Sequence, residues 1–328
     1  MNLTGVRITG TGSCLPERVV TNDMLSETLD TSNEWILSRT GISERRFAGP
    51  DEATSDFAIP AARRALEAAG KKPEDVDMVL CATMTPDMMM PTVASLVQRE
   101  LGLVNAGGYD INSACTGFVQ TITAGSNYIR SGLSKCCLVI GAETMTRIID
   151  PNDRSTAVIF ADGAGAAVLE PADPEESDLI AMSAGLKGDD EVLVVKAGGS
   201  RYPITPERIA AGEHYVLMRG RETFRFAVKT FARLITETCE KAGVAPTDLA
   251  VVVPHQVNMR IIEAAVERTG IVKETCFLNI ATVGNTSAAS VAIALDHAVA
   301  AGRMKRGDLV LFVAFGGGLS WASALFRW

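Results

Sequence analysis

The chain has 328 residues, 47% of them hydrophobic, and its 31 basic and 39 acidic residues give a formal net charge of −8. This apolar content excludes an intrinsically disordered chain, and no run approaches the roughly 18 consecutive apolar residues of a membrane span. The acidic balance disfavours nucleic-acid binding, which needs a broadly basic surface. At roughly 150 residues per domain, the length predicts about two domains.

The amino terminus (residues 1–20) predicts a strand followed by a polar turn. It has no basic segment ahead of an apolar one, so we expect no export signal. The 7 cysteines form no Cys-x-x-Cys pair, which disfavours a zinc ribbon or a dithiol redox site. Disulfide frameworks belong to small secreted domains, so we expect reduced thiols and a cytoplasmic location.

Runs rich in β-branched residues alternate with helical stretches along the chain, which is typical of an α/β fold. The predicted strands are, in chain order, 76–83, 136–142, 157–160, 250–255 and 309–315. The predicted helices are 54–70 and 224–243, and each ends in Ala-Gly, a usual stop signal. One polar linker is expected, at 170–178.

The halves on either side of this linker resemble each other. Residues 69–80 match 242–253, and the helical stretch 115–132 matches 285–302. We interpret this as a duplicated βαβα unit, with halves at residues 1–173 and 174–328. If the halves pack around a pseudo-twofold axis, Cys115 and Asn285 occupy equivalent positions and meet at its centre.

Cys115 lies in DINSACTGF, directly before a predicted helix. A thiol at a helix N-terminus faces the positive end of the helix dipole and free N–H groups. That placement lowers a thiol pKa from about 8.5 to roughly 3.5–7.5. We therefore predict a nucleophilic thiolate at Cys115. The alternative is a buried structural cysteine, which is the expectation for the other cysteines.

Only 3 histidines are present, and two of them, His214 and His297, are expected to be structural. His255 ends the predicted strand 250–255, where open α/β sheets place their ligands. Any Cys–His chemistry must therefore use His255. Asn285 either joins Cys115 at the centre of the duplication or is an ordinary helix N-cap.

The glycine clusters exclude a phosphate-binding loop and disfavour a dinucleotide-binding one. Residues 10–16 lack the third glycine of a dinucleotide fingerprint, and no phosphate-binding G-x-x-x-x-G-K occurs. The segment 160–170 predicts a turn with close backbone packing. The glycines in 315–321 follow a buried strand, where bare backbone can approach a ligand and supply oxyanion-hole N–H groups.

Together the motifs DINSACTGF, VVPHQVNMRII, GNTSAAS, FADGAGAAVL and FGGGLSWASALFRW closely resemble β-ketoacyl-ACP synthase III of bacterial fatty-acid synthesis. TSNEWILSRTGISERRF and MRGRETFRFAV extend the resemblance over essentially the whole chain. It implies a thiolase-like fold, in which two duplicated βαβα halves form a five-layered αβαβα core, and a homodimer.

The resemblance also implies a catalytic set. Cys115 is then the nucleophile, which takes the acyl group of an acyl-CoA, and the backbone of Cys115 and Gly317 forms the oxyanion hole. His255 and Asn285 would hold the thioester carbonyl of malonyl-ACP during decarboxylation and condensation. This chemistry needs no metal and no redox cofactor, since the CoA thioester is a substrate.

Binding surfaces follow from the same resemblance. Trp35 and Arg154 would sandwich the CoA adenine, with Arg39 and Arg260 near the phosphates or the pantetheine entrance. Met90 would gate the acyl pocket of the partner subunit, and Phe224 is assigned to the acyl pocket. Segments 186–201 and 279–287 depart from the family pattern, which leaves the substrate open.

Independently, basic residues recur every four positions on one predicted helix, at Arg221, Arg225, Lys229 and Arg233. On an acidic protein, this stripe and Arg260 predict docking of an acidic carrier protein. The alternative is a merely solvated helix face.

Other functions remain as alternatives. A thiolase-fold acyltransferase of secondary metabolism would keep the acyl-cysteine but use a different acceptor. A non-catalytic carrier-binding protein would have no need of Cys115, His255 and Asn285 together. A nicotinamide oxidoreductase is disfavoured by the incomplete glycine fingerprint.

Overall fold

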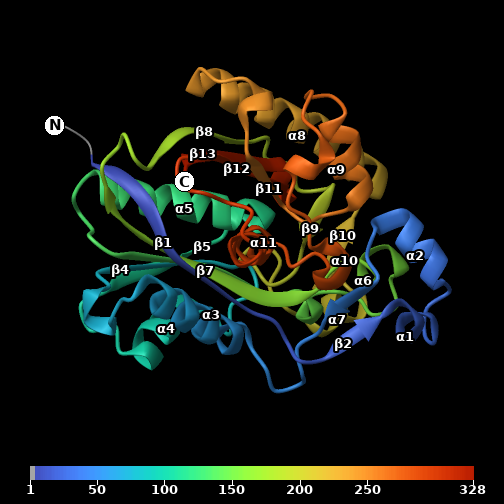
Figure 1. Ribbon diagram of the computed structural model, residues 1–328. Coiled ribbons are helices and arrows are strands. Elements are labelled where there is room, and N and C mark those ends of the chain that lie inside the picture. Colours follow the sequence, from blue (N-terminus) through green and yellow to red (C-terminus); the bar gives the residue numbers. More distant parts are fainter. Residues whose placement is uncertain (1–3) are drawn as a thin grey trace.

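The computed structural model describes residues 4–328 and stacks two β-sheets between layers of helices (Figure 1). The first sheet has the strand order β1-β7-β6-β4-β5. Its strands are β1 (Gly5–Cys14), β4 (Met78–Ala82), β5 (Gly107–Ile111), β6 (Cys137–Thr144) and β7 (Asp162–Ala172). The neighbours β4, β5 and β6 run parallel, whereas β7 is antiparallel to both β1 and β6.

The second sheet repeats this arrangement, with the order β11-β12-β13-β8. Its strands are β8 (Asp178–Leu186), β11 (Val251–Pro254), β12 (Leu309–Gly316) and β13 (Ser320–Arg327). They take the places of β1, β4, β6 and β7, with the same relative directions. In the second sheet, the position that corresponds to β5 is taken by a single β-bridge between Val252 and Cys276. The duplication inferred from the sequence is confirmed, whereas a division at residue 173 stays a prediction.

Three layers of helices complete the αβαβα stack (Figure 1). Helices α5 (Gly117–Arg130) and α11 (Ala289–Ala300) lie between the sheets. Helices α3 (Thr54–Ala69) and α4 (Val93–Leu101) cover the outer face of the first sheet, and α8 (Gly220–Ala242) and α9 (Met259–Val266) cover that of the second. The expected five-layered thiolase-like core is confirmed.

The sequence accounts for which helix takes which layer. Most side chains of α11 are small or apolar, and those of its first seven residues are all buried, which suits a helix that enters between two sheets. Helix α8 instead buries one face and exposes a charged one, which suits an outer layer. The expected stops of α3 and α8 are also present, since Gly70 and Gly243 take the left-handed conformation at φ 64° and 70°.

Two local predictions are wrong. Residues 157–160 do not form the predicted strand. Ala157 is the last residue of a short helix, α6 (Arg154–Ala157), which forms because the Asp153 side chain accepts a hydrogen bond from Ser155 N–H. A short apolar run does not distinguish strand from helix by itself. The predicted turn at 160–170 is the strand β7, although the expected close packing is present. A Cβ on Gly165 would lie 2.5 Å from the carbonyl carbon of Ala292 in α11.

Short elements surround the ends of the two sheets where the site lies. They are β2 (Val19–Thr21), α1 (Asn22–Ser26), α2 (Asn33–Thr40), β3 (Glu44–Arg46), β9 (Leu193–Val195), α7 (Pro206–Ala210), β10 (Val216–Met218) and α10 (Ile280–Val283). Within residues 4–328, no helix is long and apolar enough to cross a lipid bilayer.

Candidate active site

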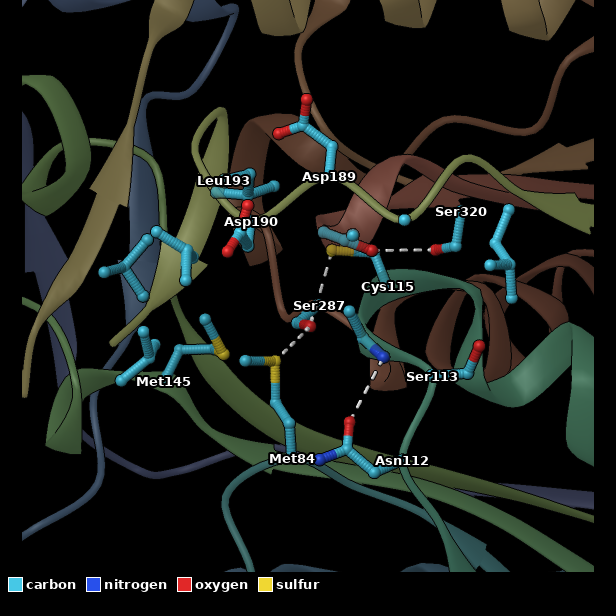
Figure 2. Close-up of a pocket in the computed structure, with 18 of the residues that line it drawn as sticks. Met84, Asn112, Ser113, Cys115, Met145, Asp189, Asp190, Leu193, Ser287 and Ser320 are labelled. Carbon is cyan, nitrogen blue, oxygen red and sulfur yellow. Dashed lines mark hydrogen bonds between the residues drawn. The ribbon is translucent and has the colours of Figure 1, made fainter. Parts of the chain in front are cut away.

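Two cavities meet at Cys115, between the carboxyl ends of the parallel strands. The larger, of about 440 Å³, is shown in Figure 2 and is lined by Met84, Met145 and Ser287, among others. The smaller, of about 160 Å³, is lined by His255 and Asn285 as well as Cys115. The structure therefore brings together the three residues that the sequence singled out.

Cys115 is held at the start of α5 by close backbone packing. It lies in a single 3₁₀ turn between β5 and α5, and its side chain is buried. Gly316, at the end of β12, approaches so closely that a Cβ there would lie 2.8 Å from Cys115 N. Only glycine allows this approach, which brings the glycine segment after β12 against the cysteine.

Burial and hydrogen bonding act in opposite directions on the thiol. Burial raises the pKa of Cys115 to about 11, whereas hydrogen bonds from Ser287 and from the backbone N–H groups of Cys115 and Gly317 lower it. Ser287 Oγ donates to Cys115 Sγ over 3.5 Å (Figure 2). The expected low thiol pKa is therefore wrong for the resting protein, because loss of water outweighs these donors.

His255 is a buried, neutral imidazole at the end of β11. Its backbone N–H donates to Val313 O over 2.8 Å, which fixes the residue beside β12. The ring meets that of Phe315 edge-on, with centroids 5.8 Å apart, and its Nδ1 lies 2.5 Å from Ser290 Oγ. Burial lowers the pKa of His255 to about 3, so the ring is uncharged at neutral pH.

Asn285 precedes α11 by four residues, so the alternative that it is an ordinary helix N-cap is wrong. The cap position belongs to Ala288, and Asn285 Oδ1 instead accepts the N–H of Ser287 over 2.9 Å. A parallel bridge to Phe160 holds the Asn285 backbone. With Oδ1 occupied within its own loop, the amide nitrogen is the group left to act as a donor.

Backbone strain is concentrated around the cysteine. Among the described residues, the non-glycine residues with positive φ are Ala114, Ser287 and Leu319, at 46°, 49° and 50°. All three line the cavities beside Cys115. Such conformations cost roughly 1–3 kcal/mol each and persist where the surrounding structure imposes them, as at functional sites.

Sequence reasoning missed a buried carboxylate beneath the site. Glu143, at the end of β6, accepts hydrogen bonds from Thr83 Oγ1 and from the backbone and hydroxyl of Thr85. Burial raises the pKa of Glu143 to about 7. The available signal was a lone acidic residue directly after the apolar run 136–142.

The comparisons with known proteins agree with this geometry. The family profile described as 3-oxoacyl-[acyl-carrier-protein (ACP)] synthase III matches residues 109–188, and that of its C-terminal part matches residues 239–328. A beta-ketoacyl-[acyl-carrier-protein] synthase III from Symbiobacterium thermophilum is 46% identical, over 100% of this chain and 99% of its own length. The chain belongs to the β-ketoacyl-ACP synthase III family. It is a condensing acyltransferase of fatty-acid synthesis.

Solved structures resemble the synthase over its whole length. The crystal structure of 3-oxoacyl-[acyl-carrier-protein] synthase III from Aquifex aeolicus VF5 has a TM-score of 0.91 at 42% identity, and covers 99% of this chain and 100% of that one. The priming beta-ketosynthase from the R1128 polyketide biosynthetic pathway has a TM-score of 0.91 at 37% identity, with 99% and 97% covered.

The residues predicted to bind CoA lie on neighbouring elements of the synthase. The Arg154 guanidinium lies 4.8 Å from the Trp35 ring centroid, so the two groups stack directly on each other. Asn258 Nδ2 donates to Arg39 O, which ties α2 to the start of α9. Arg260 is exposed and lies 6.0 Å from the Phe224 ring.

The basic stripe of the synthase is shorter than the sequence suggested. Arg221, Arg225 and Lys229 are exposed on α8. Arg233 instead packs over the Trp321 ring at 4.7 Å and lies 3.8 Å from Glu237, so it is part of the fold's own contacts.

The two residues assigned to the acyl pocket lie in different places. Phe224 lines the smaller cavity with His255, and it is not among the residues that line the larger one. Met90 is 84% exposed and lines neither cavity of its own chain. Within residues 4–328, no cluster of three or more His, Cys, Asp or Glu side chains has the arrangement of a metal site.

Proposed function

We propose that the synthase transfers the acyl group of an acyl-CoA to Cys115 and then condenses it with malonyl-ACP. The observation that carries this proposal is the convergence of Cys115, His255 and Asn285 on one cavity. The backbone N–H groups of Cys115 and Gly317 both act to lower the pKa of the Cys115 thiol, which supports their assignment as the oxyanion hole.

The first half-reaction acylates the cysteine. Cys115 Sγ attacks the thioester carbonyl carbon, and the resulting oxyanion accepts hydrogen bonds from the two N–H groups. The carbon–sulfur bond to CoA then breaks, and the thiol proton ends on the departing CoA. Each oxyanion donor stabilises the intermediate by about 3–4 kcal/mol.

The second half-reaction forms the carbon–carbon bond. As carbon dioxide leaves malonyl-ACP, the electron pair moves into an enolate, whose oxygen accepts hydrogen bonds from His255 Nε2 and the Asn285 amide. The enolate carbon attacks the acyl carbonyl, and Cys115 leaves and takes up a proton. A neutral imidazole suits this role, and burial keeps the pKa of His255 far below 7.

CoA and the carrier protein would both dock over the entrance to the smaller cavity. We assign Trp35, Arg39, Arg154 and Arg260 to CoA, with Arg154 moving off Trp35 to admit the adenine between them. We assign Arg221, Arg225, Lys229 and Arg260 to the acidic carrier protein, because all four are exposed and basic on an otherwise acidic chain.

We also propose that the synthase is a homodimer. Strand β5 is an edge of its sheet, and edge strands are usually covered. Nearby Met89 and Met90 are 93% and 84% exposed, which is unusual for large apolar side chains. The partner subunit's Met90 would then line the larger cavity, where the acyl chain binds. We place the protein in the cytoplasm, consistent with 7 free cysteines.

Intact-mass measurement of the protein with a panel of acyl-CoAs, followed by malonyl-ACP, tests the reaction. We expect an acyl adduct on Cys115 that disappears only when malonyl-ACP is added. Cys115→Ala should form no adduct. His255→Ala should form the adduct and retain it, because acylation does not use the imidazole.

A second candidate is an acyltransferase with a different acceptor. It is motivated by segments 186–201 and 279–287, whose departures from the family pattern leave the substrate open. An adduct that survives malonyl-ACP would support this candidate and contradict the condensation. Loss of acylation in His255→Ala would show that the roles are divided differently.

A further inference from the structure

Ser290 is buried against the back of the proposed catalytic histidine. It lies in the first turn of α11, and its side chain and that of His255 are each 1% exposed. Ser290 Oγ lies 2.5 Å from His255 Nδ1, well within hydrogen-bond distance. The role that this contact plays depends on which of the two groups carries the proton.

The surroundings of the hydroxyl decide the direction of the hydrogen bond. Ser290 Oγ also lies 3.4 Å from the backbone N–H of Gln256, which donates to it. If His255 Nδ1–H donated as well, the hydroxyl proton would have no acceptor among the described residues, and a buried donor without a partner is costly. If the hydroxyl donates to Nδ1, every polar group in this contact is satisfied.

The direction of this bond fixes where the imidazole holds its own proton. In a neutral ring one nitrogen accepts and the other donates, so an Nδ1 that accepts leaves the proton on Nε2. Within the described residues Nε2 has no hydrogen-bond partner, and His255 lines the smaller cavity beside Cys115 and Asn285. The ring therefore presents a donor, rather than an acceptor, to whatever binds there.

We propose that Ser290 is a positioning residue that holds His255 in the tautomer protonated on Nε2. This inference deepens the proposed function and rests on it for the activity readout. In the condensation, an Nε2 donor stabilises the developing enolate oxygen, whereas an Nε2 lone pair would repel it. Ser290 itself contacts no substrate.

Nitrogen NMR of protein labelled with ¹⁵N-histidine reads the tautomer directly. The chain has only 3 histidines, and His214→Gln and His297→Gln assign the other two. We expect Nδ1 of His255 to be unprotonated and Nε2 to be protonated in the wild-type protein at neutral pH. A spectrum with the proton on Nδ1 would overturn the proposal without any variant of Ser290.

Kinetics of Ser290→Ala separate a positioning role from a structural one. We expect malonyl-ACP decarboxylation to fall about tenfold, the effect of losing roughly one hydrogen bond, while acylation of Cys115 is unchanged. Ser290→Thr should restore the rate. Ser126→Ala is the matched control, since Ser126 is a buried serine of α5 whose hydroxyl donates to Ile122 O.

An equal loss in both half-reactions, or a loss no larger than that of Ser126→Ala, would contradict the proposal. Failure of the proposed function looks different: wild-type protein would then not decarboxylate malonyl-ACP at all. The tautomer measurement stands in either case, because it needs no substrate.

Discussion

At the scale of single residues, the chemistry of Cys115 depends on donors that partly offset its burial. Burial raises the pKa of the thiol to about 11, and three hydrogen-bond donors lower it. Ser287 is the donor among them that comes from a side chain. Its positive φ of 49° shows that the loop is held in a strained conformation that brings its hydroxyl to the sulfur.

Removal of the Ser287 hydroxyl should make the thiol less reactive. In Ser287→Ala we expect the pKa of Cys115 to rise further and the rate of alkylation by iodoacetamide at pH 8 to fall about 3- to 10-fold, as the loss of one hydrogen bond implies. The measurement is the pH profile of alkylation, with the adduct mapped to Cys115.

Ser287→Gly is the companion variant, because glycine also lacks the hydroxyl but adopts positive φ without strain. If the hydrogen bond is responsible, both variants should shift the profile equally. A shift in Ser287→Ala alone would instead show that the backbone conformation matters, and it would contradict the role of the hydroxyl.

At the scale of elements, α8 buries one face in the core and exposes a basic face, to which we assign the carrier protein. Three of its exposed basic residues, Arg221, Arg225 and Lys229, form one row near its N-terminus, and none of these three is within ion-pair distance of an acidic residue in the described part of the chain. Unpaired like charges in a row are unfavourable for the helix itself. Their arrangement is explained if an acidic partner binds there.

Neutralising part of this face should weaken carrier binding. We expect Arg225→Ala combined with Arg260→Ala to raise KM for malonyl-ACP by roughly 5- to 30-fold at low salt, at about 1 kcal/mol for each charge. The difference from wild type should shrink as salt screens the interaction.

Lys135→Ala is the control, since Lys135 is exposed and precedes β6, at the end of the sheet opposite Cys115. It should leave KM for malonyl-ACP unchanged. An unchanged KM in the Arg225 and Arg260 double variant would refute docking on this face.

The contact between β7 and α11 determines how closely the first sheet approaches the central helices. Gly165 leaves no room for a Cβ, which would lie 2.5 Å from Ala292 C. Gly165→Ala should therefore force the layers apart and lower the free energy of unfolding by about 1–3 kcal/mol.

Thermal unfolding measures this effect. Gly199→Ala is the control, because Gly199 lies in a loop outside both sheets and its added Cβ would meet nothing within 4 Å. Equal melting temperatures for the two variants would mean that the layers adjust without strain.

At the scale of the whole molecule, the proposed dimer completes the larger cavity and covers the edge of β5. We expect the wild-type protein to sediment as a dimer. Met90→Asp should shift it toward monomer, because burying an unpaired carboxylate in an apolar interface is unfavourable.

Val272→Asp is the control for Met90→Asp, since Val272 is also an exposed apolar residue, at 63%, but belongs to the half of the chain that holds the second sheet. It should remain dimeric. A wild-type protein that sediments as a monomer would refute both the dimer and the role of Met90.

The sequence alone was sufficient for the architecture and for the three central residues. Hydrophobic periodicity and the internal repeat specified the α/β class, the duplication and the pairing of Cys115 with Asn285, and the family resemblance implied the five-layered core. His255 could be identified as the candidate catalytic histidine because the chain has only 3 histidines. The error at 157–160 arose because a four-residue apolar run contains too little periodicity to exclude a helix.

Only the tertiary structure decided the electrostatics of the site. The pKa of Cys115 depends on how much water the stacked layers exclude, and a helix N-terminus read from the sequence does not show that. Glu143, Ser287 and Ser290 bond to partners that are distant along the chain, so these hydrogen bonds exist only once the chain has folded, and the one from Ser287 to Cys115 also needs the two halves to pack. Local pattern determined which elements form, whereas long-range packing determined which polar groups share a buried space.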